Sequence, residues 1–256
     1  MELGLQDKNV VVSGSSTGIG LAIAEAFLNE GARVQISGRN PDNLDKALET
    51  LGDKHGAERI DRFCGDLTSP EAVNEALTQC ADRFGSIDGV VANMGSGKGP
   101  TGWDLSREDW RSIADTNLVG GMLLASSAIP YLKGRQNPSL TFISSIAGCE
   151  SIPAPIPYSA AKAALQMAAK NLSRQLGSEG IRVNTVAPGN VLFADGTWDI
   201  KMKEDPEQVQ RYIESEVPLG RFAEACEIAD AVVFLASMRA RFITGALITV
   251  DGGQTR

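Results

Sequence analysis

Short apolar runs alternate with longer helical patterns along the whole chain. Seven runs have the length of buried strands, and most are rich in Val and Ile and bounded by Gly, Pro or Asp: 9–13, 33–37, 59–63, 89–93, 140–144, 182–186 and 247–250. The segments between them have helical periodicity, which predicts helices near 18–29, 40–52, 69–83, 106–128, 157–176 and 223–237. Glycines stand where helix ends are expected, at positions 31, 85, 177 and 180.

Strand–helix alternation of this kind predicts an α/β fold. Each strand–helix–strand unit places its two strands parallel through a right-handed crossover, and the helices then cover both faces of the sheet. No repeat, low-complexity tract or linker divides the sequence. We therefore expect one domain over residues 1–256, built on a doubly wound parallel sheet of seven strands.

The segment 190–216 interrupts this rhythm between the sixth and seventh strands. It contains Phe193, Trp198 and Tyr212 together with many charged residues, and no turn short enough to be a plain connection. A long insertion in a compact domain is usually functional. We expect a lid over a substrate site here; the alternative is a surface helix with a structural role only.

Composition narrows the classes of function. Apolar residues make up 43% of the 256 residues and the formal net charge is −8. An acidic chain without a basic block is a poor candidate for binding nucleic acid or an anionic membrane, because that affinity comes from Lys and Arg. The N-terminus has no signal-peptide pattern and no apolar run reaches the length of a membrane span. These features favour a cytoplasmic protein.

Metal chemistry is not expected from this sequence. The four cysteines, Cys64, Cys80, Cys149 and Cys226, are scattered without the spacing of metal ligands, and they are interpreted as reduced thiols. The single histidine, His55, lies in a polar stretch with no partner for a zinc site or a catalytic triad. We predict no metal site.

The first strand runs into a glycine-rich turn and then a helix, with the sequence SGSSTGIG. Its glycines, Gly14, Gly18 and Gly20, leave room for the backbone to approach a pyrophosphate and for the helix to pack against the strand. The helix N-terminus offers free N–H groups and the positive end of the helix dipole to the phosphates. A tight turn without a ligand is the alternative interpretation.

The same turn resembles the TGxxxGIG signature of the short-chain dehydrogenase/reductase family, and the resemblance extends from Lys8 to Gly253. It implies a Rossmann-like fold that binds a nicotinamide dinucleotide. The positions that match the dinucleotide site of the family are Gly14, Ser16, Thr17, Gly18, Ile19 and Gly20 in the turn, then Asp66, Leu67, Asn93, Gly95, Pro188, Gly189 and Val191. Three positions depart from the family pattern: Ala92 and Met94 replace Asn and Ala, and Phe193 replaces a Thr.

The end of the second strand bears on the choice of dinucleotide. NAD-preferring members of the family carry an acidic residue where this chain has Gly38, and the next residue is Arg39. A guanidinium with no carboxylate beside it can pair with a 2′-phosphate. The residues therefore favour NADP(H). NAD(H) stays possible, because some NADP-dependent members carry a second basic residue where this chain has Thr17.

Tyr158 and Lys162 stand four residues apart in a predicted helix, on one face of it. Ionising a tyrosine of pKa about 10 at pH 7 costs roughly 4 kcal/mol. A cation about 4 Å away at an effective dielectric near 20 supplies roughly 4 kcal/mol. The pair therefore predicts a tyrosine that acts as a general acid or base.

Two further residues match the family's catalytic set. Ser145 ends the fifth strand thirteen residues before Tyr158, where its hydroxyl can orient a substrate oxygen. Asn117 lies in an apolar helix, where an asparagine costs helix propensity, and it matches the family residue that continues the proton path. The resemblance implies that Tyr158 and Lys162 also belong to the dinucleotide site, with Lys162 in contact with the ribose. We predict Asn117, Ser145, Tyr158 and Lys162 as the catalytic residues.

These features predict hydride transfer between NADP(H) and a ketone or secondary alcohol. An NAD-dependent catabolic dehydrogenase of a cyclic diol, aryl alcohol or sugar acid is an alternative, and a dinucleotide-binding scaffold without activity is a weaker one. The gap of four between Tyr158 and Lys162 argues against the enoyl-reductase branch of the family, which uses a wider gap.

Position in the sequence also suggests a partly apolar substrate pocket. Its predicted residues, beside Ser145 and Tyr158, are Met94, Cys149, Glu150, Phe193 and Trp198. The family resemblance implies a homotetramer, with helices 106–128 and 157–176 in one interface and the C-terminal strand in another. A homodimer is the alternative.

Overall fold

A parallel sheet of seven strands forms the centre of the molecule. The computed structural model describes residues 2–256. Its strands lie in the order β3-β2-β1-β4-β5-β6-β9, and every neighbouring pair is parallel. They are β1 Asn9–Val12, β2 Arg33–Gly38, β3 Ile60–Cys64, β4 Gly89–Ala92, β5 Ser139–Ile143, β6 Arg182–Pro188 and β9 Leu247–Val250. The predicted α/β class and the doubly wound sheet are confirmed.

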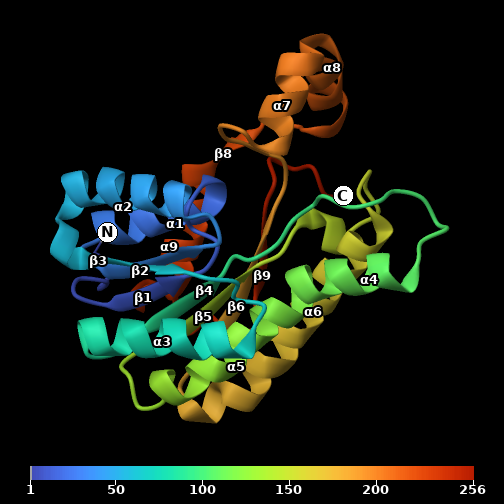
Figure 1. Ribbon diagram of the computed structural model, residues 1–256. Helices are drawn as coiled ribbons and strands as arrows, with labels where there is room; N and C mark the ends of the chain where they lie inside the picture. The colour runs from blue at the N-terminus through green and yellow to red at the C-terminus, as the bar shows by residue number, and fades with distance from the viewer. Residues whose placement is uncertain (1) are drawn as a thin grey trace.

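Helices cover both faces of this sheet (Figure 1). One face carries α1 Gly18–Asn29, α2 Pro41–His55 and α9 Ala225–Ala236. The other face carries α3 Pro70–Phe84, α4 Arg107–Ala114, α5 Gly120–Leu132 and α6 Ile156–Leu176. Strands covered on both sides bury nearly all their residues, which explains their continuous Val and Ile runs.

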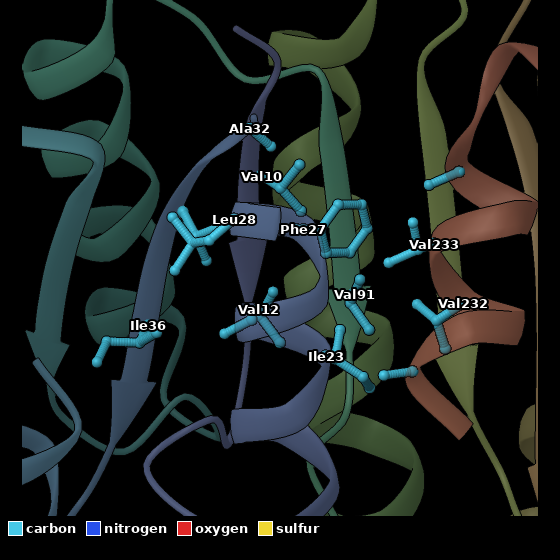
Figure 2. Packing of buried hydrophobic residues seen from close by; sticks show 14 of the residues in the cluster. Val10, Val12, Ile23, Phe27, Leu28, Ala32, Ile36, Val91, Val232 and Val233 are labelled. Carbon is cyan, nitrogen blue, oxygen red and sulfur yellow. The ribbon is translucent and has the colours of Figure 1, made fainter. Parts of the chain in front are cut away.

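Each face has its own hydrophobic core. Figure 2 shows the first, where Val10 and Val12 of β1 meet Phe27 of α1 and Val232 of α9. The second core lies between the opposite face and helices α3, α5 and α6, around Phe142. Residues of the two cores alternate along β1, as the period of two in a strand requires.

The strand order reverses direction at β1. From β1 the chain adds β2 and β3 on one side, and β4, β5, β6 and β9 on the other. The connections that leave the carboxyl ends of β1 and β4 therefore run to opposite faces of the sheet. In doubly wound sheets, ligands bind in the crevice at this switch point.

The predicted helix 106–128 is divided and longer than expected. It comprises α4, a π-helical turn at Asp115–Val119, and α5, which continues to Leu132. Pro130 lies inside the last turn, where its missing N–H costs one hydrogen bond, and buried Leu132 anchors that turn on the core. A π-helical turn inserts an extra residue, and such turns frequently occur at functional sites.

Residues 190–216 form a small unit beside the carboxyl ends of the strands. It contains β7 Val191–Leu192, α7 Thr197–Glu204 and α8 Pro206–Glu216, and β7 pairs with a second short strand, β8 Ala223–Glu224. The predicted helix 223–237 therefore begins two residues late. Figure 1 shows α7 and α8 projecting away from the sheet and its covering helices. Within residues 2–256, no helix has the length and apolar content to cross a membrane.

Candidate active site

The glycine turn after β1 has the backbone shape that its sequence predicts. Gly14 and Gly18 have φ angles of 60° and 57°, in the left-handed region that other residues rarely adopt. A Cβ added to Gly20 would collide with the Gly14 carbonyl oxygen. The Asn93 amide, at the end of β4, donates to the carbonyl oxygens of Ser13 and Gly14 at 3.1 and 3.0 Å. Asn93 therefore ties the two sides of the switch point together.

The N-terminus of α1 presents unpaired backbone donors. Thr17 makes no side-chain cap bond there, and the first turn of α1 contains no acidic residue. In contrast, Asn40 caps α2 and Ser69 caps α3 with side-chain oxygens. Free N–H groups with the positive end of the helix dipole bind phosphate well. The turn and the N-terminus of α1 thus fit the pyrophosphate of a dinucleotide.

The carboxyl end of β2 lies beside the same turn. A Cβ added to Gly38 would lie 2.9 Å from the Ser16 hydroxyl, and Arg39 extends into solvent. The backbone N–H of Thr68, its hydroxyl and the Arg39 charge together hold the pKa of Asp66 below its usual value, against the effect of burial. Position 38 itself is a glycine, so no carboxylate there would repel a phosphate held by the Arg39 guanidinium and the Ser16 hydroxyl.

The first three turns of α6 carry the tyrosine and the lysine. Lys162 is 4% exposed, and its Nζ donates to the Ile143 carbonyl oxygen of β5 at 2.9 Å. Burial lowers the pKa of Lys162 to about 8. The ammonium lies 5.9 Å from the centroid of the Tyr158 ring, so the lysine stands on the ring side of the phenol.

Burial acts on Tyr158 in the opposite direction. It raises the pKa of the half-buried phenol, and the hydrogen bond to the Ser145 side chain partly offsets this rise. Ser145 follows β5 and begins a 3-10 turn, where its Oγ accepts the Ala147 N–H at 3.1 Å. That bond uses a lone pair and leaves the hydroxyl proton free to donate. The Ser145 hydroxyl therefore lies where it can influence the Tyr158 hydroxyl.

Asn117 lies in the π-helical turn and is 2% exposed. Its Oδ1 accepts the Ser96 N–H at 2.9 Å, while its Nδ2 donates to the carbonyl oxygens of Ile113 and Ser96 at 3.0 and 3.2 Å. Gly95 adjoins both Asn117 and Lys162, because a Cβ added to it would lie 2.8 Å from Asn117 Oδ1 and 2.9 Å from Lys162 Nζ. The π-helical turn, the loop after β4 and α6 therefore meet at the lysine.

Met94 and Phe193, both predicted for the substrate pocket, contact other parts of the protein. The Met94 side chain packs against the second core, with its methyl group beside Gly120. The Phe193 ring lies against the glycine turn: a Cβ added to Gly18 would be 2.8 Å from ring atom Cε2. Met94 follows Asn93 in an extended segment, where neighbouring side chains point to opposite sides, so the Met94 side chain points toward the core.

Trp198 and Glu150 also have protein partners. Trp198 stacks on Tyr212, with ring centroids 4.8 Å apart, and its Nε1 donates to Asn190 Oδ1 at 3.0 Å. It therefore belongs to the small apolar cluster of residues 190–216. Glu150 accepts the backbone N–H of Arg256 at 2.7 Å, which brings the C-terminal residues to the loop after β5. Cys149, also predicted for the pocket, is exposed in that loop.

Other residues of the site were not predicted. The loop after β4 passes over the tyrosine, since a Cβ added to Gly97 would lie 3.9 Å from Tyr158 Cζ. Gln166 bonds to the loop after β5. The spacing of Tyr158, Lys162 and Gln166, each four residues apart, could have identified Gln166.

Comparison with known proteins agrees with this geometry. A family model described as enoyl-(acyl carrier protein) reductase matches residues 14–255. The chain is 36% identical over 250 residues to the 3-oxoacyl-(acyl-carrier-protein) reductase FabG of Chlamydia muridarum, which covers 97% of this chain and 98% of that protein. The chain belongs to the short-chain dehydrogenase/reductase family. The resemblance noted in the sequence is confirmed.

Other short-chain dehydrogenases/reductases are about equally similar. A 3alpha-hydroxysteroid dehydrogenase of Mediterraneibacter gnavus is 31% identical over 248 residues, 97% of each chain. The crystal structure of L-sorbose reductase from Gluconobacter frateurii, complexed with NADPH and L-sorbose, superposes with a TM-score of 0.93 at 32% identity, covering 100% of this chain and 99% of that one. The protein is accordingly an oxidoreductase of this family, acting on CH–OH or C=O groups.

Proposed function

We propose that the protein transfers a hydride between NADP(H) and a ketone or secondary alcohol, with Tyr158 as the general acid or base. One observation carries the proposal. At the start of α6, the buried Lys162 ammonium lies 5.9 Å from the centroid of the Tyr158 ring. Burial raises the pKa of the phenol, which Ser145 partly offsets, and lowers the pKa of the lysine to about 8. Both groups lie beside the loop after β4, one of the two connections that leave the switch point of the sheet.

The nicotinamide, when bound, supplies or accepts the hydride. In the direction of reduction, the Tyr158 hydroxyl gives its proton to the substrate oxygen, which becomes the hydroxyl of the product. The Ser145 hydroxyl donates a hydrogen bond to that same oxygen and holds it in place. Lys162 stabilises the phenolate that remains, because its charged ammonium lies 5.9 Å from the centroid of the Tyr158 ring. Asn117 bonds to the backbone of Ser96 and so holds the loop after β4 in place beside Lys162.

Two features support NADP(H) over NAD(H). Position 38 is a glycine, so it places no carboxylate there, and Arg39 and the Ser16 hydroxyl lie beside it. The similar L-sorbose reductase structure is described as a complex with NADPH. The spacing of four from Tyr158 to Lys162 supports carbonyl rather than enoyl reduction.

Arg39 provides the first test. We expect kcat/KM with NADPH to exceed that with NADH in the wild type. Arg39→Ser should lower kcat/KM for NADPH by about tenfold to a hundredfold and leave NADH nearly unchanged, because a charge-assisted bond to phosphate is worth about 1.5–3 kcal/mol. Arg59→Ser serves as a matched control, because Arg59 precedes the amino end of β3, at the opposite end of the strands from Gly38. A wild type that prefers NADH, or an equal loss with both dinucleotides, would contradict the proposal.

Residues 190–216 are proposed as a lid over the substrate. Their short strand pair and two-helix cluster form a unit with its own apolar centre, standing beside the carboxyl ends of the strands (Figure 1).

We also propose a cytoplasmic homotetramer. Leu247 on edge strand β9 and Met167 on α6 are 45% and 62% exposed, which supports contact surfaces at both places. Light scattering after size exclusion would measure the mass.

A further inference from the structure

Gln166 lies one turn beyond Lys162, on the face of α6 that also carries Tyr158. Its Nε2 is 3.1 Å from the Ser145 carbonyl oxygen and 3.0 Å from the Ser144 hydroxyl. The same nitrogen is 3.4 Å from the sulfur of Cys149. One amide thus contacts both ends of the segment 144–149, here called the serine turn.

The bonding pattern fixes which atoms of Gln166 face the serine turn. A carbonyl oxygen can only accept, so the group opposite the Ser145 oxygen must be the NH₂ of the amide. The Ser144 hydroxyl donates its proton to the Lys162 carbonyl oxygen at 3.1 Å, and it therefore accepts from Gln166. Both amide protons are used on the serine turn. A carboxylate at this position has no proton for either bond at neutral pH.

The serine turn has little other freedom against α6. A Cβ added to Gly148 would lie 2.7 Å from the Lys162 carbonyl carbon and the Ala163 nitrogen, so the turn packs on the helix backbone. Within the turn, Ser145 Oγ accepts the Ala147 N–H. The place of the Ser145 hydroxyl relative to Tyr158 therefore depends on how the turn is held on the helix. Gln166 supplies two of the side-chain bonds that hold it, beside the bond from Ser144 to the Lys162 carbonyl oxygen.

We propose that Gln166 is a positioning residue that holds the serine turn, and with it the Ser145 hydroxyl, in place against Tyr158. The proposal rests on the proposed function, because it takes Ser145 and Tyr158 as the groups that act on the substrate oxygen. Gln166 acts through Ser145 and has no part in binding the dinucleotide.

Gln166→Met and Gln166→Glu test this in the full-length enzyme. Both variants remove the two donated bonds. Met is an apolar side chain of similar size, and Glu is a negatively charged one. We expect kcat to fall about tenfold to a hundredfold with the Kd for NADPH changed less than about twofold, as for a misplaced catalytic group. The pKa that governs kcat should rise, since a displaced Ser145 hydroxyl no longer lowers the pKa of Tyr158. An unchanged pH profile with kcat within about twofold of wild type would overturn the proposal.

Lys170→Met is the matched control. Lys170 lies one turn further along the same face, and its Nζ donates to the Gly245 carbonyl oxygen at 2.8 Å, away from the serine turn. Losing that bond should leave kcat and its pH profile unchanged. If Lys170→Met changes kcat and its pH profile as much as Gln166→Met does, the effect is a general one of α6 and the proposal is wrong.

Two measurements separate this proposal from the proposed function. If Gln166 acts through Ser145, Gln166→Met should cost little further kcat in a Ser145→Ala background; additive losses would contradict the proposal. If Ser145→Ala itself retains kcat, the proposed function is wrong about Ser145. Hydrogen exchange of residues 144–149, which needs no turnover, should be faster in Gln166→Met than in wild type or Lys170→Met. Equal exchange would overturn the positioning role.

Discussion

Burial sets the proton affinities of Tyr158 and Lys162 on α6. It raises the pKa of Tyr158 and lowers that of Lys162 to about 8, so the two groups change in opposite directions. At neutral pH the lysine is still mostly charged and the tyrosine protonated. That state suits reduction, where the phenol must deliver a proton and a cation must favour the phenolate left behind.

The lowered pKa of Lys162 predicts how stability depends on pH. The unfolded chain, with a lysine pKa of about 10.4, binds more protons than the folded one between pH 8 and 10.4, so stability rises with pH there. We expect the free energy of unfolding of wild type, minus that of Lys162→Met, to rise by roughly 2 kcal/mol from pH 7 to 9.5. Urea titrations at both pH values measure it. A difference that stays constant or falls would contradict the burial of the ammonium.

Spacing along a helix predicts which side chains share a face. Spacing along one helix brought Tyr158 and Lys162 to the same face, as expected. Side chains in loops were harder, because neighbours in an extended segment point to opposite sides. Met94 therefore packs in the core while Asn93 reaches the glycine turn, and Phe193 lies on Gly18. Nothing in the sequence alone distinguishes these directions.

At the scale of elements, an arginine at the start of β6 caps the C-terminal end of α9. Arg182 is the first residue of β6, is 6% exposed, and donates to the carbonyl oxygens of Leu235 and Ala236 in the last turn of α9. It also donates to Asn137 Oδ1 at 2.9 Å. Burial lowers the pKa of Arg182 to about 10, which leaves it charged at neutral pH. The guanidinium thus satisfies carbonyl groups that a helix end leaves unpaired.

Removing this arginine should destabilise the fold. We expect Arg182→Met to lower the free energy of unfolding by about 3 kcal/mol, because several buried carbonyl oxygens lose a charged donor. Urea unfolding at a fixed protein concentration measures the loss. Arg174→Met, at an exposed position in the last turn of α6, is the control and should change stability by less than about 0.5 kcal/mol. A loss below about 1 kcal/mol for Arg182→Met would contradict the capping role.

Elements with clear periodicity were predicted well, and short ones were not. Helix α1 and strand β9 begin and end where expected. Strands β7 and β8 have two residues each, too few for any pattern, and only their pairing defines them. The π-helical turn at Asp115–Val119 was also missed, since one extra residue in a turn barely alters an apolar period. The costly asparagine in that helix was the one available signal.

At the scale of the whole molecule, the order of the strands creates the site. At the reversal, the connections from β1 and β4 leave on opposite faces of the sheet, and the serine turn follows β5, the neighbour of β4. Strand–helix alternation in the sequence is enough to predict such a sheet. It does not predict what enters the crevice beyond the dinucleotide, because the residues predicted for the substrate pocket pack partly against the protein itself.

We propose that Tyr158 exchanges the proton while the rest of the fold holds the dinucleotide. The most direct measurement follows NADPH absorbance at 340 nm with a panel of ketones, in wild type and Tyr158→Phe, alongside the Kd for NADPH. We expect wild-type turnover, a loss of kcat of at least about a hundredfold in Tyr158→Phe, and a Kd for NADPH within about threefold of wild type. Tyr158→Phe with unchanged kcat would contradict the account.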